Sequence, residues 1–182
     1  MKKIMAALVM AISTSAFAGG WASLDVDSVQ GRDGAKDSTA TYLRLGKDFG
    51  STSMMLQGRT ARFDGGGLVN SVEATVSNSR FGFGGVRPFV GFGYDHGYNG
   101  GKDFNYGLVG ATYGRPVGPG FALLGAKTRV GSTQDGPRTK QTVTFATYSL
   151  PVTKEVSLNL NLSRSDQTIK ENAVGLGFGV RF

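Results

Sequence analysis

The last ten residues of the chain, 173–182, constrain its fold most strongly. Successive side chains of a strand point to opposite faces, so a period of two residues gives the segment one apolar face. Such a face is stable only where a second protein layer or hydrocarbon covers it. Apolar side chains stand at every second position and an aromatic ends the sequence: Val174, Leu176, Phe178, Val180 and Phe182.

The first eighteen residues have the three parts of a secretory signal peptide. Lys2 and Lys3 form a basic start, residues 4–12 form an uncharged apolar run, and Ala16 and Ala18 form a small-x-small cleavage site. The run is about half the ~20 residues that a membrane-spanning helix needs. We therefore predict cleavage after residue 18 and one exported domain over residues 19–182.

The remainder of the sequence divides into short alternating segments separated by turn residues, without the 3.6-residue period of an amphipathic helix. The chain has no cysteine, so packing and backbone pairing must supply its stability. We predict an all-β fold. The expected strands cover residues 20–28, 39–47, 52–62, 68–83, 87–96, 104–114, 121–130, 139–149, 154–163 and 171–182.

The connections between these strands alternate in character. Longer polar connections (29–38, 63–67, 97–103, 131–138, 164–170) alternate with tight ones (48–51, 84–86, 115–120, 150–153). A bilayer accepts only structures whose backbone groups are bonded internally, which are helices and closed barrels. The pattern predicts a closed antiparallel up-and-down transmembrane β-barrel of about ten strands, with its longer loops outside. Eight strands remain an alternative if the hairpin near Asn78-Ser79-Arg80 does not form.

Strand alternation also assigns faces. In segment 154–163, Val156, Leu158, Leu160 and Leu162 would face lipid, whereas the serines and asparagines between them would face inward. Segments 104–114 and 121–130 are apolar on both faces, which would also suit a soluble β-sandwich. The inward set carries charges of both signs: Asp25, Asp27, Arg44, Arg59, Glu73, Asp95, Lys127, Arg129 and Arg181.

Charges of opposite sign in a narrow lumen are expected to pair, because an unpartnered buried charge is costly. We therefore predict a salt-bridged interior that fixes strand register. A narrow polar path that selects small ions is the functional alternative. Barrels of this size are largely filled by side chains, so an open pore for large solutes is not expected.

The sequence offers little for catalysis. His96 is the only histidine, and if Asp95 points into the barrel then His96 points out. There is no Gly-x-Ser-x-Gly motif and no second histidine for a metal site with nitrogen ligands. We expect no catalytic residues, no metal and no cofactor. A surface hydrolase that uses His96 remains the enzymatic alternative.

Two segments carry a family resemblance. Residues 87–94, Arg-Pro-Phe-Val-Gly-Phe-Gly-Tyr, and the terminal alternation from Val174 to Phe182 resemble small bacterial outer-membrane β-barrels of the OmpA-like, OmpX-like and opacity-protein group. The resemblance implies location in the outer membrane and insertion by the barrel-assembly machinery. It also implies that the machinery reads a C-terminal signal formed by Phe178, Val180 and Phe182. Barrels of this group usually have eight strands.

These observations lead to one functional expectation and two alternatives. The chain is expected to be a non-enzymatic outer-membrane barrel with a structural or surface-interaction role. A narrow porin-like channel for small solutes or ions is the first alternative and the hydrolase is the second. The formal net charge is +7. For an exported chain, the anionic partner we expect is lipopolysaccharide beside outer-membrane lipid, and not nucleic acid.

Overall fold

A computed structural model describes residues 19–97, 102–133, 138–167 and 170–182. The predicted signal peptide, with Ala16 and Ala18, lies outside the described residues. No helix in the described ranges is long and apolar enough to cross a membrane. The elements are β1 (Gly20–Gly31), β2 (Ser38–Phe49), β3 (Thr52–Phe63), β4 (Leu68–Asn78), the short 3-10 helix η2 (Ser79–Phe81), β5 (Val86–Gly97), β6 (Lys102–Val117), β7 (Gly120–Thr133), β8 (Arg138–Pro151), β9 (Val156–Gln167) and β10 (Glu171–Arg181).

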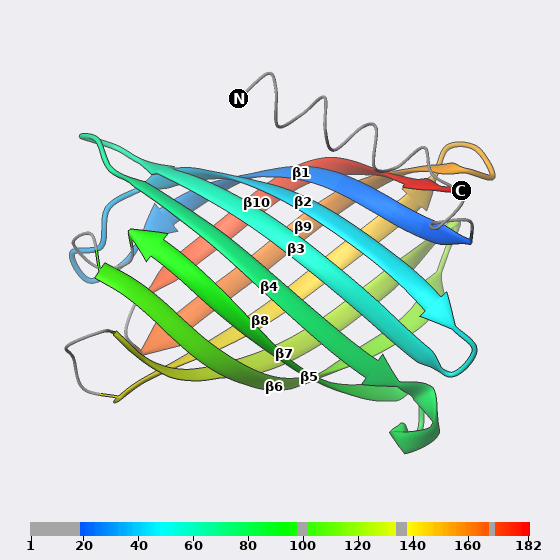
Figure 1. Cartoon of the computed structure of the whole chain (residues 1–182). Helices are drawn as coiled ribbons and strands as arrows, with labels where there is room; N and C mark the ends of the chain where they lie inside the picture. The colour runs from blue at the N-terminus through cyan, green and yellow to red at the C-terminus, as the bar shows by residue number, and fades with distance from the viewer. Residues whose placement is uncertain (1–18, 98–101, 134–137, 168–169) are drawn as a thin grey trace.

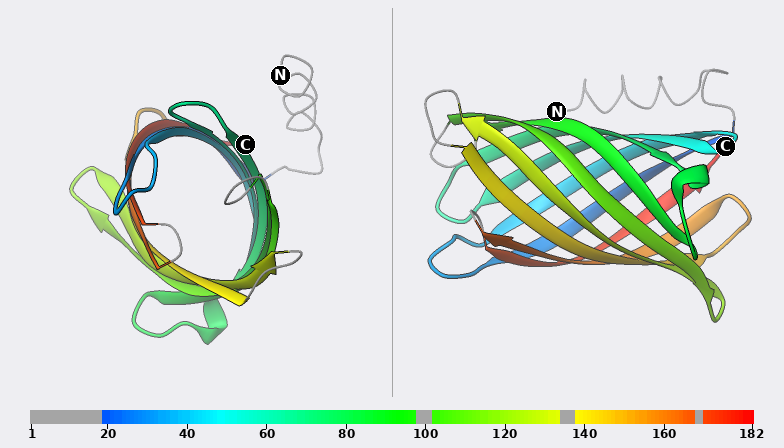
Figure 2. Two further views of the ribbon diagram at one scale, coloured as in Figure 1. Left: turned by 90° about the vertical axis from the view of Figure 1, so that its left-hand side faces the viewer. Right: turned by 90° about the horizontal axis from the view of Figure 1, so that it is seen from below.

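The ten strands form a single closed antiparallel barrel (Figures 1 and 2). Each strand pairs with its neighbours in the chain, and β1 closes the ring by pairing with β10 from Trp21↔Arg181 to Gly31↔Glu171. The predicted closed barrel of ten strands is therefore confirmed, and the eight-stranded alternative is wrong. The β1–β10 pairing places the start of β1 and the end of β10 at the same end of the barrel (Figure 1).

The fourth predicted strand was too long. In the structure β4 ends at Asn78. The Asn78 side chain accepts a hydrogen bond from the Arg80 backbone N–H at 2.8 Å and so begins η2. Gly84 and Gly85 then adopt φ values of 60° and 85°, which favour glycine and turn the chain back into β5. A strand through Phe81 and Phe83 is therefore replaced by a turn that exposes both rings.

Several strands extend further than predicted, mainly at the end of the barrel opposite the termini. β1 continues to Gly31, β7 to Thr133 and β9 to Gln167, so the connections there are shorter than the sequence suggested. The β4–β5 connection at the other end is now longer than its neighbours at that end. Loop length therefore distinguishes the two ends poorly.

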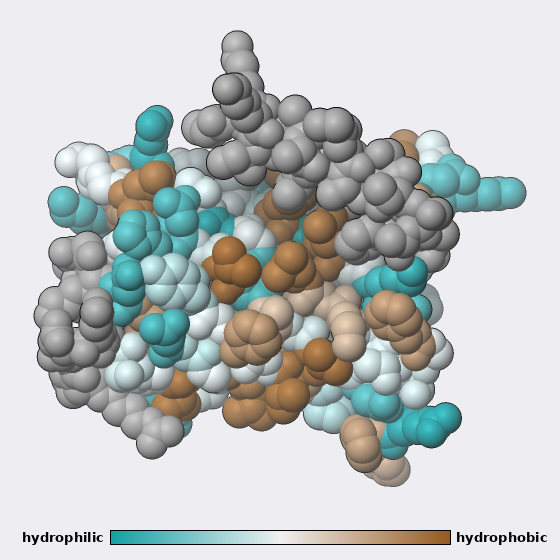
Figure 3. Space-filling view, viewed as in Figure 1, coloured by the Kyte–Doolittle hydropathy of each residue, from teal (hydrophilic) through white to brown (hydrophobic). Residues whose placement is uncertain are grey.

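The exposure of side chains follows the alternation of each strand. Figure 3 shows apolar side chains across the middle of the barrel and hydrophilic ones towards its ends. We call the exposed apolar outward positions the belt: Val26, Leu56, Val72, Val76, Val90, Phe92, Val109, Leu124, Leu158, Leu160, Leu162, Val174, Leu176 and Phe178. Beyond the belt, away from the termini, outward positions are polar and form the collar: Ser28, Gln30, Thr39, Thr41, Thr60, Asn70, Asn105, Thr144, Arg164 and Asn172.

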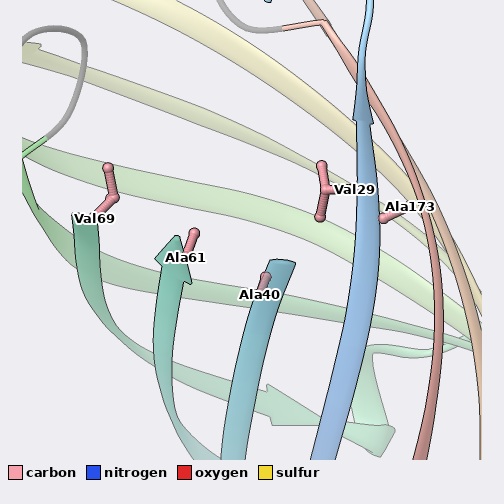
Figure 4. Packing of buried hydrophobic residues seen from close by; sticks show 5 residues of the cluster. All are labelled: Val29, Ala40, Ala61, Val69 and Ala173. Atoms are coloured by element: carbon pink, nitrogen blue, oxygen red, sulfur yellow. The ribbon is translucent and has the colours of Figure 1, made fainter. Parts of the chain in front are cut away.

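The interior combines small apolar patches with charges. Figure 4 shows the first patch, which lies on β10 and β1–β4 and consists of Val29, Ala40, Ala61, Val69 and Ala173. A second patch on β6 contains Phe104, Tyr106 and Leu108, with Phe89 packed against it. The sequence left the orientation of segment 104–114 open. The second patch settles it, because these three side chains are buried, while Val109, the next residue after Leu108 and a member of the belt, is exposed.

Candidate functional site

The central feature of the lumen is an ion cluster around Glu73. Glu73 on β4 accepts hydrogen bonds from Lys127 Nζ at 2.5 Å and Arg129 Nη2 at 2.8 Å, both on β7. β4 and β7 are not neighbours in the ring, so these bonds cross the lumen. Tyr106 on β6 donates to Glu73 Oε2 at 3.4 Å and to Asp95 Oδ1 at 3.3 Å. The cluster therefore braces one wall of the barrel against another.

A second cluster surrounds Asp25 on β1, which is completely buried. Its carboxylate pairs with Arg44 Nη1 and accepts hydrogen bonds from Ser23 Oγ at 2.9 Å and Asn161 Nδ2 at 2.9 Å. Asn159 Nδ2 lies at 3.4 Å. The two asparagines belong to β9, and β10 lies between them and β1. The carboxylate thus binds donors on both sides of β10.

Glycines on β10 make this second cluster possible. A Cβ at Gly177 would lie 2.2 Å from Asp25 Oδ1, and a Cβ at Gly175 would lie 1.8 Å from Asp27 Oδ1. At positions 175 and 177 the inward face of β10 therefore has no side chain, and two aspartates of β1 occupy the space there. At Gly179 the nearest atom would be the rotatable Ser157 Oγ at 2.9 Å.

The third group of lumen charges is less completely paired. Arg59 Nη2 lies 3.9 Å from Glu171 Oε2. Tyr42 lies between two guanidinium groups, with Arg44 4.8 Å and Arg59 5.7 Å from its ring centroid. Within the described part of the chain, Asp27 Oδ1 and Arg59 Nε are buried without a hydrogen-bond partner. These groups are thus less completely hydrogen-bonded than those of the two clusters around Glu73 and Asp25.

The structure places most of the predicted lumen residues on the inward face. Asp25 and Arg44 form one pair, and Glu73 pairs with Lys127 and Arg129. Arg181 does not join them: it is exposed at the end of the barrel where the termini lie. Phe178 points outward in the belt, and the Phe182 backbone N–H donates to Gly20 O at 3.1 Å.

Sequence reasoning missed Glu171, Tyr106 and Gln57 as lumen residues. Gln57 accepts a hydrogen bond from Arg44 Nε at 2.8 Å. The alternation of side chains along β10 could have identified Glu171, because it lies two residues before the inward Ala173 and so shares its face. Tyr106 had no such signal, because apolar residues occupy both faces of its strand.

His96 lies outside the barrel, as the alternation predicted. Its Nδ1 is 2.7 Å from Asp103 Oδ1, and Tyr94 Oη donates to Asp103 Oδ2 at 2.6 Å. Within the described ranges, no serine or threonine hydroxyl hydrogen-bonds to His96, and no group of three or more His, Cys, Asp or Glu residues could hold a metal ion. The arrangement orients an imidazole without supplying a nucleophile.

One ion pair lies in the connections beyond the strands. Lys170 Nζ donates to Asp33 Oδ2 at 2.7 Å and so ties the β1–β2 connection to the start of β10. This hydrogen bond from Lys170 is the main reason that the pKa of Asp33 is lowered from its ordinary value. Asp33 also adopts a φ of 55°, a conformation that aspartate tolerates better than most residues.

The fold and its interior thus define a ten-stranded antiparallel barrel with a charged, cross-braced lumen and an apolar outer surface. No protein-family model and no curated protein matches the chain. Neisserial surface protein A is similar at 11% identity and a TM-score of 0.47, over 91% of this chain and 98% of that one. The translocator domain of the autotransporter NalP from Neisseria meningitidis is similar at 10% identity and a TM-score of 0.48, over 100% of this chain and 96% of that one.

A third solved structure extends the comparison to a longer protein. OmpT of Vibrio cholerae, from the outer membrane, is similar at 13% identity and a TM-score of 0.41. The match covers 91% of this chain and 62% of that one, so this chain spans less than two thirds of its length. Membership of the OmpA-like, OmpX-like and opacity-protein group stays a prediction, and the ten strands differ from the eight usual there.

Proposed function

We propose that the chain is an integral β-barrel of the bacterial outer membrane with a structural or surface-interaction role. The proposal rests on the observation that large apolar side chains are exposed on the outside while charged side chains are buried inside: Leu176 is 68% and Phe92 70% exposed, whereas Asp25 is 0% exposed. Leaving a large apolar side chain in water costs roughly 1.5–3 kcal/mol relative to burying it. A belt of such side chains on eight of the ten strands supports a hydrocarbon surrounding.

The polar collar supports an orientation in that membrane. On β9 the apolar positions begin with Val156, the first residue of the strand, and give way to Arg164 and Asp166 before the other end. Outer-membrane barrels keep their termini on the periplasmic side. We therefore place the collar and the connections 32–37 and 64–67 outside the cell. Because these connections are short, the collar supplies much of the outer surface.

The lumen favours a structural role over a channel. Glu73 on β4 binds Lys127 and Arg129 on β7, three strands further along the ring, and Asp25 binds donors on both sides of β10. A free path for ions would need these bonds to open. Single-channel recording in planar bilayers tests this: stable conductance steps from the purified barrel would support the channel alternative instead.

We also propose that the protein is not an enzyme. His96 is held by Asp103 on the outer face, with no hydroxyl nucleophile bonded to it in the described residues. Replacing His96 with alanine is expected to leave the release of fatty acids from outer-membrane lipids unchanged. A loss of such activity in this variant would support a hydrolase.

Membrane location itself is tested with two matched charge substitutions on the outer face. Leu160→Arg places a cation in the belt on β9, and Thr144→Arg places one in the collar on β8. An arginine facing lipid near the bilayer midplane costs about 2–4 kcal/mol, and one near the interface about 0–1 kcal/mol. We expect Leu160→Arg alone to lower the temperature at which the compact band on unheated gels is lost. Equal behaviour of the two variants, with a wild-type protein that stays soluble without detergent, would refute the proposal.

A further inference from the structure

The collar contains a groove that the structural role described above does not use. The groove has a volume of about 410 Å³ and lies across the outer ends of β10, β1 and β2. Asp37 and Asp64 from two neighbouring connections stand at its rim, and the Asp64 backbone N–H donates to Asp37 O at 2.9 Å. The side chains that line its floor come from outward positions: Ser28, Gln30, Thr39, Asn172 and Val174.

Register brings these floor residues together. Ser28 on β1 is directly opposite Val174 on β10 and Thr39 on β2, and Gln30 is directly opposite Asn172. Directly opposed side chains on one face of an antiparallel pair lie about 5 Å apart. Two hydroxyls and two amides therefore converge on one small surface.

None of these four polar side chains has a hydrogen-bond partner within the described part of the chain, whereas Thr60, Asn70, Thr144 and Arg164 of the same collar are bonded. Thr60 Oγ1, for example, donates to Asn70 Oδ1 at 3.0 Å in the same collar. The floor of the groove thus offers several donors and acceptors that the fold itself does not occupy.

The charges around the groove define which ligand suits it. The rim carboxylates of Asp37 and Asp64 accept hydrogen bonds from hydroxyls, and amides and hydroxyls bond hydroxyls in both directions. Arg62 and Arg164 lie directly opposite Thr39 and Asn172 on the same outward face, so cations as well as carboxylates border the groove. Val174, which is 55% exposed, forms the edge of the floor towards the belt. A ligand that fits these features has hydroxyl groups above an acyl chain.

We propose that this groove binds the sugars of a glycolipid in the outer leaflet, and that its amides and hydroxyls recognise the hydroxyls of the saccharide. The inference rests on the proposed function, because only a barrel inserted with its collar outward places the groove at head-group level. Gln30 and Asn172 are the principal hydrogen-bonding residues. Val174 and Val26 contact the acyl chain beneath the sugar.

The test uses the full mature barrel in detergent, with fluorescent lipopolysaccharide that carries its complete core, fluorescent lipid A without core sugars, and free core oligosaccharide. The groove variant is Gln30→Ala with Asn172→Ala. The matched control is Asn105→Ala with Thr144→Ala, which removes an amide and a hydroxyl from the collar at β6 and β8. Fluorescence anisotropy gives the Kd for the two labelled lipids, and competition gives it for the oligosaccharide.

We expect the groove variant to weaken lipopolysaccharide binding about tenfold, as the loss of two amide ligands implies, with less than about a twofold change for lipid A. The control variant should match the wild type. Equal binding of lipopolysaccharide by wild type and groove variant, or equal affinity of the wild type for lipid A and lipopolysaccharide, would overturn the proposal. Free oligosaccharide that binds as tightly as lipopolysaccharide would overturn the glycolipid assignment.

Gel migration of unheated samples separates failure of this inference from failure of the proposed function. All three proteins should show the compact band, because the substituted side chains point away from the lumen. In the described ranges, only Thr144 among them makes a protein hydrogen bond, a long one of 3.5 Å from its Oγ1 to Arg164 O. A wild type without that band would count against the barrel in the membrane, whereas normal bands with unaltered sugar binding count against the groove alone.

Discussion

Substitution of Gly177 by alanine is the sharpest test of how the lumen is built. The new Cβ would lie 2.2 Å from Asp25 Oδ1 and 2.5 Å from the Leu24 carbonyl oxygen. A side-chain oxygen can move, but the carbonyl belongs to the closing pair of strands and cannot move without shifting the backbone. The substitution therefore disturbs both the Asp25 cluster and the β1–β10 pairing.

The size of the effect follows from these two contacts. Overpacking a well-packed interior costs about 1–3 kcal/mol. Displacement of Asp25 adds part of the cost of weakening a buried, charge-assisted hydrogen bond, about 1.5–3 kcal/mol. We expect the free energy of unfolding to fall by about 3 kcal/mol. With a urea m-value of about 2 kcal/mol/M, the midpoint would fall by about 1.5 M.

Gly179→Ala is the matched control on the same face of the same strand. There the nearest atom is Ser157 Oγ at 2.9 Å, and the hydroxyl can rotate away. We expect a change below about 1 kcal/mol, partly offset by the lower entropy of the unfolded chain. Urea unfolding in detergent, followed by the change from compact to extended gel migration, measures both variants. Equal midpoints for the two variants would show that Asp25 does not lie over β10 as described.

Two further predictions concern charges. Glu73→Gln leaves the buried cations of Lys127 and Arg129 without their carboxylate partner and should lower the free energy of unfolding by about 3 kcal/mol. The control Glu155→Gln, at an exposed turn, should change it by less than about 0.5 kcal/mol. Similar urea midpoints for the two variants would contradict the cross-lumen brace. Because the pKa of Asp33 is lowered in the folded chain, its bond with Lys170 contributes above the ordinary pKa of 3.8 and is lost as the pH falls through the lower folded pKa. A carboxyl titration by NMR should show Lys170→Ala moving the midpoint of Asp33 upward, and an unmoved midpoint would contradict the pair.

The strands were predictable where the two faces of a strand differ in chemistry. In β9, leucines alternate with serines and asparagines, so its faces and the inward position of Asn159 and Asn161 follow from the sequence. β6 carries Phe104, Tyr106 and Leu108 on one face and Val109 on the other. When both faces of a strand are apolar, the sequence does not show which face points inward. For β6 only the register with β5 and β7 assigns the two faces.

The pairing of the lumen charges was harder to predict from the sequence. The alternation of side chains predicts that Glu73 and Arg129 both point inward. Their contact depends on the curvature of the closed ring, which brings β4 and β7 within reach of each other across the lumen although β5 and β6 lie between them. The local sequence also concealed the turn after Asn78. There the cap formed by Asn78 and the positive φ of Gly84 and Gly85 end a strand whose apolar alternation continues through Phe81 and Phe83.

The height of the belt has a consequence for the surrounding lipid. The apolar outward runs from Val156 to Leu162 and from Val174 to Val180 each cover roughly 15–20 Å along the barrel axis, given a rise of about 3.3 Å per residue and a tilt of about 40°. This is less than the hydrocarbon thickness of an average bilayer, about 30 Å. In the membrane location proposed above, the barrel would suit a thin bilayer and would compress a thicker one around its circumference, so we expect refolding to be most efficient in short-chain lipids.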